Sequence, residues 1–270
     1  MKFSYMLAPM EGFSDNSFRT ICYKYGADLT FTEMARFESL ARKNKSTLEK
    51  IKINNDTPTV IQIIGYDDAL LRKFLDDFKP GEGFFGFNFN LGCPAPMFLN
   101  HGMGCAMIKR ITKINRLINI VKEKNYQCSI KLRLGMNEFE KKKKVYLNLI
   151  NNADADFFIV HARHGKESYD DVADWGVFEE CCKTGKKIIA NGDIKTITDV
   201  EALKKFGVNG VMIGRESTKN PAVFNQLKGL KIPEISEIKK EYLKIADNEK
   251  YKKNVLKYLG NELTIKNSKY

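Results

Sequence analysis

Short runs of β-branched and aromatic residues alternate with amphipathic stretches along most of the chain, and turn or capping residues bound each run. The runs predicted as strands are Phe3–Ala8, Ala27–Thr32, Thr59–Ile64, Phe84–Asn90, Ser129–Leu134, Phe157–His161, Lys187–Ala190 and Gly210–Ile213. The predicted helices between them are Asp15–Lys24 behind Ser14 as N-cap, Asp68–Phe78, Lys113–Lys124, Glu138–Asn151, Trp175–Lys183, and Thr198–Phe206 behind Thr196 or Thr198. Strict alternation of strands and helices calls for a parallel sheet covered by helices.

The number of strands decides between two α/β architectures. Eight units in about 215 residues fit a closed (β/α)8 TIM barrel better than an open doubly wound sheet, which usually has about five or six strands. No Gly-x-Gly-x-x-Gly motif stands at a strand-to-helix turn. We therefore predict an α/β TIM barrel over residues 1–230 and a short Lys-rich helical extension over residues 231–270, with helices at Glu234–Asp247 and Lys250–Leu263.

Composition narrows the class of protein. With 270 residues, 43% of them hydrophobic, and modest Gly and Pro, the chain is neither collagen-like nor disordered. No apolar run approaches the roughly 20 residues that span a bilayer, so we expect a cytoplasmic protein that neither enters a membrane nor is exported. The cysteines, expected to be free thiols, are Cys22, Cys93, Cys105, Cys128, Cys181 and Cys182.

The charge is +12, from 45 Lys plus Arg against 33 Asp plus Glu. Such an excess favours a polyanionic partner, because cations that neutralise phosphates release counterions. An AT-rich coding sequence would also enrich lysine whatever the function. The charge alone therefore leaves nucleic-acid binding undecided.

In a barrel the chemistry lies at the carboxyl ends of the strands, where this sequence places unusual polar residues. Asn191, Asp193, Gly214 and Arg215 follow the last two strands, the usual phosphate site of this fold, although either loop alone reads equally well as a turn. Lys131 would stabilise a reduced, electron-accepting ring, unless it forms a salt bridge with Glu33 or Asp193. Gln62 would pair with the polar edge of that ring.

Cys93 lies in a tight Gly-Cys-Pro turn, and a thiol with a pKa near 8.5 can deliver a proton at neutral pH. No base is its neighbour in sequence, which disfavours a thiolate nucleophile. His161 is the other proton carrier predicted at a strand end. No His or Cys pair has metal-ligand spacing, so we predict no metal site.

Together these segments resemble the tRNA-dihydrouridine synthase family, in order and over roughly residues 3 to 228. They are Ala8–Arg19, Gln62–Gly65, Asn90–Pro94, Gly102–Gly104, Lys131–Arg133, His161–Arg163, Asn191–Ile194 and Gly214–Arg215, with Asn220, Pro221 and Phe224. The Asn-Leu-Gly-Cys-Pro loop, followed by Lys-x-Arg, His-x-Arg and Asn-Gly-Asp, makes the resemblance specific.

The resemblance implies an FMN-dependent reductase that uses NADPH to saturate the C5–C6 bond of uridines in tRNA. Cys93 would protonate C5 while hydride reaches C6 from the flavin. The residues implied at the flavin are Pro9, Met10, Gln62, Lys131, His161, Asn191, Asp193, Gly214 and Arg215. Asn90 and Arg163 would contact the uracil. A uridine inside a helix must be turned out of its stack to reach such a site.

Two other functions remain open at this point. One is an FMN barrel that reduces a free pyrimidine or enone, as dihydroorotate dehydrogenases do. The other is a non-catalytic RNA-binding relative. Family members usually continue into a helical bundle that grips tRNA, whereas about 40 residues follow Lys228 here. We therefore expect residues 231–270 to be a reduced tRNA-binding domain and the protein to be a monomer.

Overall fold

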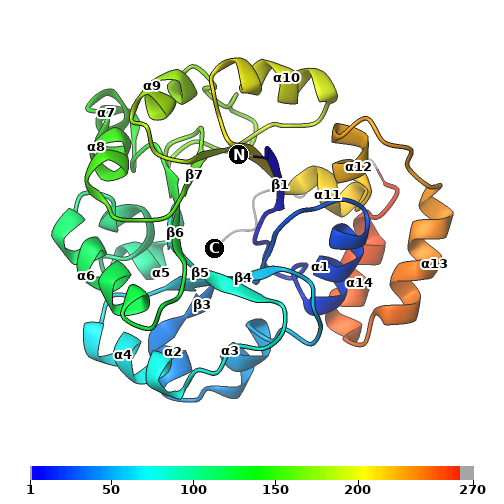
Figure 1. The fold of residues 1–270 in the computed structure, drawn as a ribbon, viewed down its shortest axis with the longest axis horizontal. Coiled ribbons are helices and arrows are strands. Elements are labelled where there is room, and N and C mark those ends of the chain that lie inside the picture. The colour runs from blue at the N-terminus through cyan, green and yellow to red at the C-terminus, as the bar shows by residue number, and fades with distance from the viewer. Residues whose placement is uncertain (1, 262–270) are drawn as a thin grey trace.

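Parallel strands stand side by side around a central axis in the computed structural model, which describes residues 2–261 (Figure 1). The strands are β1 (Ser4–Leu7), β2 (Thr30–Phe31), β3 (Ala35–Arg36), β4 (Thr59–Ile64), β5 (Phe84–Leu91), β6 (Cys128–Arg133), β7 (Phe158–His161), β8 (Ile188–Asn191) and β9 (Gly210–Ile213). Their order is β1-β9-β8-β7-β6-β5-β4-β2, with β3 also paired to β4. The predicted α/β barrel is confirmed.

The barrel closes between its first two strands. The Leu7 N–H donates to the Leu29 carbonyl over 2.9 Å, and Met6 forms a parallel bridge with Leu29. β2 and β3 occupy a single place in the barrel because both pair with β4. The strand predicted over 27–32 is present but shorter, as β2 with a bridge at Leu29, and β3 was not predicted. The break falls after Phe31, where the chain presents the buried Glu33 carboxylate to the Gly12 N–H.

The helices form a ring outside the strands (Figure 1). They are α1 (Asn16–Lys24), α2 (Phe37–Ala41), α3 (Lys45–Lys50), α4 (Asp68–Asp77), α5 (Pro96–Leu99), the 3-10 turn η1 (Gly104–Met107), α6 (Ile111–Lys122), α7 (Glu138–Lys142), α8 (Val145–Asn152), α9 (Val177–Lys183), α10 (Ile197–Lys205), α11 (Arg215–Lys219), α12 (Val223–Leu227), α13 (Ile235–Ile245) and α14 (Glu249–Tyr258). Among these described residues, no helix is both long and apolar enough to cross a membrane.

Alternation along the strands produces two apolar layers. Met6, Phe31, Ile159 and Met212 pack together in one cluster at the barrel interior, whereas Leu7, next along the chain from Met6, belongs to the larger cluster shared with the helices. Apolar contact on both faces explains why the strands read as nearly continuous hydrophobic runs.

Two predicted details were wrong. The N-cap of α1 is Asp15, whose carboxylate accepts from the Phe18 N–H over 2.9 Å, whereas the Ser14 hydroxyl accepts from the Met10 N–H. The helix predicted over 138–151 is two helices, because Lys144 adopts a left-handed backbone with φ of 52°. At α10, Thr196 is the N-cap, within the predicted pair of alternatives.

The two tail helices pack beside α1 and α12 (Figure 1). The Ser17 hydroxyl in α1 donates to the Ile245 carbonyl over 2.8 Å, and Tyr242 and Val255 are fully buried. α13 and α14 confirm the predicted pair of helices, although positions 262 and 263 of the second prediction lie outside the described residues. The tail thus shares the core of the barrel.

Candidate active site at the carboxyl end of the barrel

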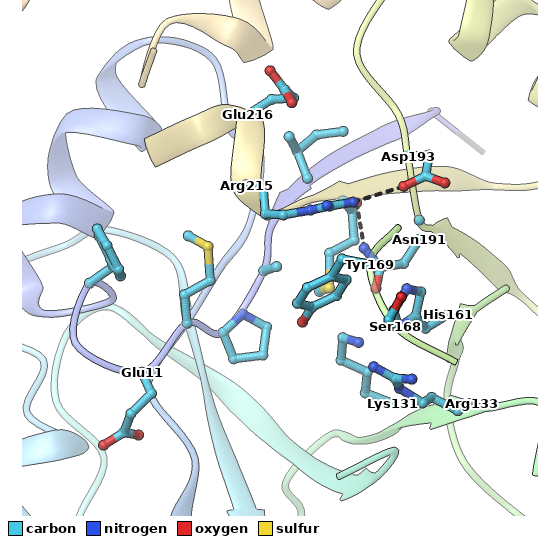
Figure 2. Close-up of a pocket in the computed structure, with 18 of the residues that line it drawn as sticks. Glu11, Lys131, Arg133, His161, Ser168, Tyr169, Asn191, Asp193, Arg215 and Glu216 are labelled. Atoms are coloured by element: carbon cyan, nitrogen blue, oxygen red, sulfur yellow. Dashed lines mark hydrogen bonds and ion pairs between the residues drawn. The ribbon is translucent and has the colours of Figure 1, made fainter. Parts of the chain in front are cut away.

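A cavity of about 740 Å³ opens at the carboxyl ends of the strands (Figure 2). The predicted site residues that line it are Pro9, Met10, Lys131, His161, Asn191, Asp193, Gly214 and Arg215. Lys131 and His161 gather on one side of the cavity and Glu11 on the other, with Arg215 between (Figure 2). The residues predicted at the carboxyl ends of the strands therefore lie around the cavity.

Lys131 projects from β6 without a protein partner. Among residues 2–261, no ion pair or hydrogen bond reaches its amine, and the alternative salt bridge is not formed, since Glu33 pairs with Lys50 and Asp193 with two arginines. Burial, followed by the neighbouring Arg133 cation, lowers the pKa of Lys131 to about 7. An amine held in this way is suited to a ligand that carries or develops negative charge.

His161 ends β7 in its neutral form. Burial and the cations Lys131, Arg133, Arg163 and Arg215 hold the pKa of His161 well below its usual value. The Arg163 guanidinium lies 3.3 Å from Nε2 and has only protons to donate, so Nε2 accepts and the ring proton resides on Nδ1. His161 therefore brings a neutral imidazole to the cavity.

Asp193 links two arginines at the predicted phosphate end. Its Oδ1 accepts from Arg215 over 2.8 Å and its Oδ2 from Arg163 over 2.5 Å and from the Ala173 N–H over 3.0 Å. Burial opposes ionisation, but these donors hold the pKa of Asp193 below its usual value. The carboxylate thus fixes the Arg215 guanidinium at the edge of the cavity.

Gly192 and Gly214, at the predicted phosphate end of the cavity, differ in whether the protein could accept a side chain at their position. Gly192 has φ of +120°, and a Cβ there would lie 3.1 Å from His161, so the protein itself demands glycine. Gly214 has no positive φ, and a Cβ would make ordinary contacts with Ala8 at 3.5 Å and Met10 at 3.7 Å. The protein leaves space at Gly214, and a flavin phosphate or ribityl chain would fit that space.

Cys93 lies beside the cavity under its own loop. Cys93 is 9% exposed and does not itself line the cavity, whereas the next three residues, beginning with Pro94, do. Burial raises the pKa of Cys93, although the Ala95 N–H and the cations Arg133 and Lys131 act in the opposite direction. The thiol is therefore protonated at neutral pH, as a proton donor requires.

Three other predicted site residues do not line the cavity. Gln62 is buried and pairs with Asn88 and Asn90 through both ends of its amide. The Asn90 Oδ1 accepts the N–H groups of Gly92 and Cys93, each over 2.9 Å, and so shapes the Cys93 turn. Gln62 and Asn90 therefore influence the cavity indirectly, because together they hold the Cys93 turn in place.

Arg163, the third, is 1% exposed. Its guanidinium donates to the carbonyls of Tyr169 and Asp171, besides Asp193 and His161. It therefore fastens the loop between β7 and α9 across the end of the barrel.

Several lining residues escaped the sequence prediction. Arg133 follows Lys131 by two residues on one strand, a spacing that puts both side chains on one face and could have revealed it. Tyr169 lies in an irregular loop without such a signal, and its ring centre is 4.5 Å from the Arg215 guanidinium carbon. Asn254, Lys257 and Tyr258 reach the cavity from α14.

Comparisons with known proteins identify the family of this chain. The family model of dihydrouridine synthase (Dus) matches residues 6–267. A probable tRNA-dihydrouridine synthase of Helicobacter pylori is 32% identical over 246 residues, covering 87% of this chain and 73% of the relative. tRNA-dihydrouridine synthase B of Pseudomonas putida is 26% identical over 248 residues, with the same two coverages of 87% and 73%.

Solved structures agree in fold. DHODH from Eimeria tenella has a TM-score of 0.55 at 13% identity, covering 95% of this chain and 84% of its own. A FabK variant from Thermotoga maritima has a TM-score of 0.51 at 13% identity, covering 82% and 64%. At such identities these likenesses show the barrel, whereas the family match spans the sequence. This chain belongs to the dihydrouridine synthase family of oxidoreductases.

Proposed function

We propose that the chain is an FMN-dependent tRNA-dihydrouridine synthase that uses NADPH to saturate the C5–C6 bond of uridines in tRNA. The observation that carries this proposal is a strand-end cavity lined by Lys131, His161 and Arg215, with the protonated thiol of Cys93 beside it. We further propose a cytoplasmic monomer with a catalytic domain over residues 1–230 and an extension over residues 231–270.

The cavity residues divide between cofactor and base. Arg215, fixed by Asp193, would hold the flavin phosphate beside Gly214, and Lys131 would face the ring. Pro9 and Met10 would line one side of the flavin, with Asn191 at its polar groups. Gln62, whose amide is engaged by Asn88 and Asn90, would support the site without touching the flavin. FMN, when bound and reduced by NADPH, supplies the hydride that adds to C6. His161 would orient the uracil, Asn90 would hold the Cys93 turn in place, and Arg163 would support the wall next to it.

Cys93 supplies the proton. Saturation of the C5–C6 bond needs one hydride and one proton, so uridine, NADPH and H⁺ give dihydrouridine and NADP⁺. The S–H bond of Cys93 would break as the C5–H bond forms, and solvent would then return the proton to sulfur. The raised pKa keeps the thiol loaded at neutral pH.

The test uses purified chain and tRNA from a strain that lacks dihydrouridine. With NADPH, the protein should bind FMN and generate dihydrouridine at defined positions, mapped nucleotide by nucleotide. Failure to form dihydrouridine at any position would overturn the proposal. A faster reaction with free uridine than with tRNA would instead favour a reductase of free pyrimidines.

A further inference from the structure

The tail helix α14 reaches the same cavity as the strand ends. Asn254, Lys257 and Tyr258 line the cavity together with the loop that follows β1. We propose that Asn254 is a positioning residue for the flavin site, which holds the loop formed by residues 9–13 in place as one wall of that site. This inference deepens the proposed function, because it rests on FMN as the cofactor.

The loop is held through a single residue. Gly12 has φ of +79°, its N–H donates to the buried Glu33 carboxylate, and its carbonyl accepts from the Asn254 Nδ2 over 3.0 Å. Its neighbours Met10, Glu11 and Phe13 all line the cavity. Both polar groups of Gly12 are therefore fixed from opposite parts of the chain, 21 residues downstream at Glu33 and 242 residues downstream at Asn254.

The Asn254 side chain packs tightly against Gly12. A Cβ on Gly12 would lie 2.9 Å from the Asn254 Nδ2, so the amide sits directly against the backbone of the loop. The Phe13 ring meets the Tyr258 ring edge-on, with 5.5 Å between ring centres. A shift of α14 would therefore move the loop wall with it.

α14 itself is anchored next to Asn254 and just beyond its own end. Val255 is fully buried in the core that the tail shares with the barrel. Beyond the helix, the Gly260 N–H donates to the Lys219 carbonyl over 2.9 Å, next to α11. These contacts make α14 rigid enough to hold a loop.

The Asn254 amide is engaged within the protein. Its Nδ2 donates to the Gly12 carbonyl, so this contact serves the loop after β1 and not a phosphate. The tail therefore has a task at the cofactor, separate from any docking of tRNA by its lysines.

The experiment compares Asn254→Ala with Lys253→Ala, an exposed neighbour on the same helix. FMN is titrated into each full-length apoprotein, and its affinity is read from the quenching of flavin fluorescence. Loss of one hydrogen bond that orders a binding loop should weaken FMN about tenfold in Asn254→Ala, without change in Lys253→Ala. The melting temperature of both apoproteins should stay close to that of the wild type.

A second variant protects the test against misfolding. Asn254→Asp keeps the size of the side chain and removes the Nδ2 donor that reaches Gly12, so it should weaken FMN binding in the same direction. Asn254→Gln, which retains an amide, should recover part of the affinity. FMN affinity within twofold of wild type in both Asn254→Ala and Asn254→Asp would overturn the inference.

The outcomes separate this inference from the proposed function. A wild-type protein that binds FMN and forms dihydrouridine, with Asn254→Ala binding FMN normally, defeats the positioning role alone. A wild-type protein that binds FMN but forms no dihydrouridine defeats the proposed function, while weaker FMN binding in Asn254→Ala still supports the positioning role. A wild-type protein that binds no FMN overturns both.

Discussion

Lys131 lowers the stability of the folded apoprotein, because its charged form is disfavoured there. Its amine has no acidic or hydrogen-bonding partner among the described residues, and burial together with the neighbouring Arg133 disfavours the charged form of this half-buried side chain. We expect Lys131→Met to make the apoprotein more stable by about 1–3 kcal/mol at pH 6 while it weakens flavin binding. Chemical denaturation measures the first effect and FMN titration the second.

The sign of the pH dependence follows from the lowered pKa. Because the folded-state pKa of Lys131 is about 7 and the unfolded value 10.5, the cost of its charge is complete below pH 7 and fades as pH rises toward 10.5. The gain from Lys131→Met should therefore be larger at pH 6 than at pH 9. The exposed Lys205→Met serves as control, and a variant less stable than wild type at pH 6 would contradict this account.

At Gly214, a substitution should affect cofactor binding without affecting folding. Its backbone tolerates a side chain and its protein neighbours leave room for a Cβ, so Gly214→Ala should keep the melting temperature of the apoprotein. The added methyl group would meet the flavin instead, and FMN affinity should fall roughly tenfold. Gly192→Ala, where φ is +120°, should by contrast destabilise the apoprotein, as a thermal melt would reveal.

Cys93 carries the proposed proton transfer. Cys93→Ala should retain FMN and lose dihydrouridine formation by about 10²- to 10⁴-fold, the usual worth of a positioned acid. Cys22→Ala, a substitution of a fully buried thiol in α1, is the matched control. Single-turnover reduction of tRNA by the prereduced enzyme measures the step, and an undiminished rate in Cys93→Ala would exclude this role.

Sequence reasoning at this scale succeeded where the strand-end rule applies. Lys131, His161, Asn191 and Arg215 line the cavity because each lies in the last residues of a strand or just after it. Arg163 also ends up at a strand end, but its guanidinium turns to the carbonyls of the next loop. The direction of a long side chain depends on which loop groups need donors, and a single sequence does not reveal that.

The loop between β7 and α9 is the element that Arg163 organises. Arg163→Lys keeps the charge but loses the fork that reaches Asp171, Tyr169 and Asp193 together. We expect faster amide hydrogen exchange over residues 165–173 and weaker FMN binding, since Asp193 loses one of its cations. Unchanged exchange in this loop would show that the fork is dispensable.

At the level of elements, periodicity predicted the parts governed by burial. β4 and β9 match their predicted bounds because both carry apolar residues on each face. The separation of α7 from α8 was not predicted, since residues 140–144 contain neither glycine nor proline and only the backbone of Lys144 turns left-handed. The division of β2 and β3 depends on Glu33 meeting Gly12, a long-range contact that has no local pattern.

Across the whole molecule, the first and last segments depend on each other. The loop after β1 lines the cavity, and α14, near the end of the described residues, holds that loop through Gly12. A tail that looks like an appendage in sequence shares the barrel core through Tyr242 and Val255. The sequence pattern changes where the tail begins, but the tail and the barrel pack as one unit.

Under the proposed function the charge of +12 would contribute to substrate binding, because an extruded uridine would bring its flanking phosphates to the barrel mouth. If the protein contacts about three phosphates, tRNA affinity should fall roughly 40-fold between 50 and 200 mM salt. FMN carries one phosphate, so its affinity should change only a fewfold over the same range. Parallel titrations of tRNA and FMN at several salt concentrations measure both slopes. If tRNA affinity were no more sensitive to salt than FMN affinity, the basic surface would have no part in substrate binding, and lysine-rich coding would be its sufficient explanation.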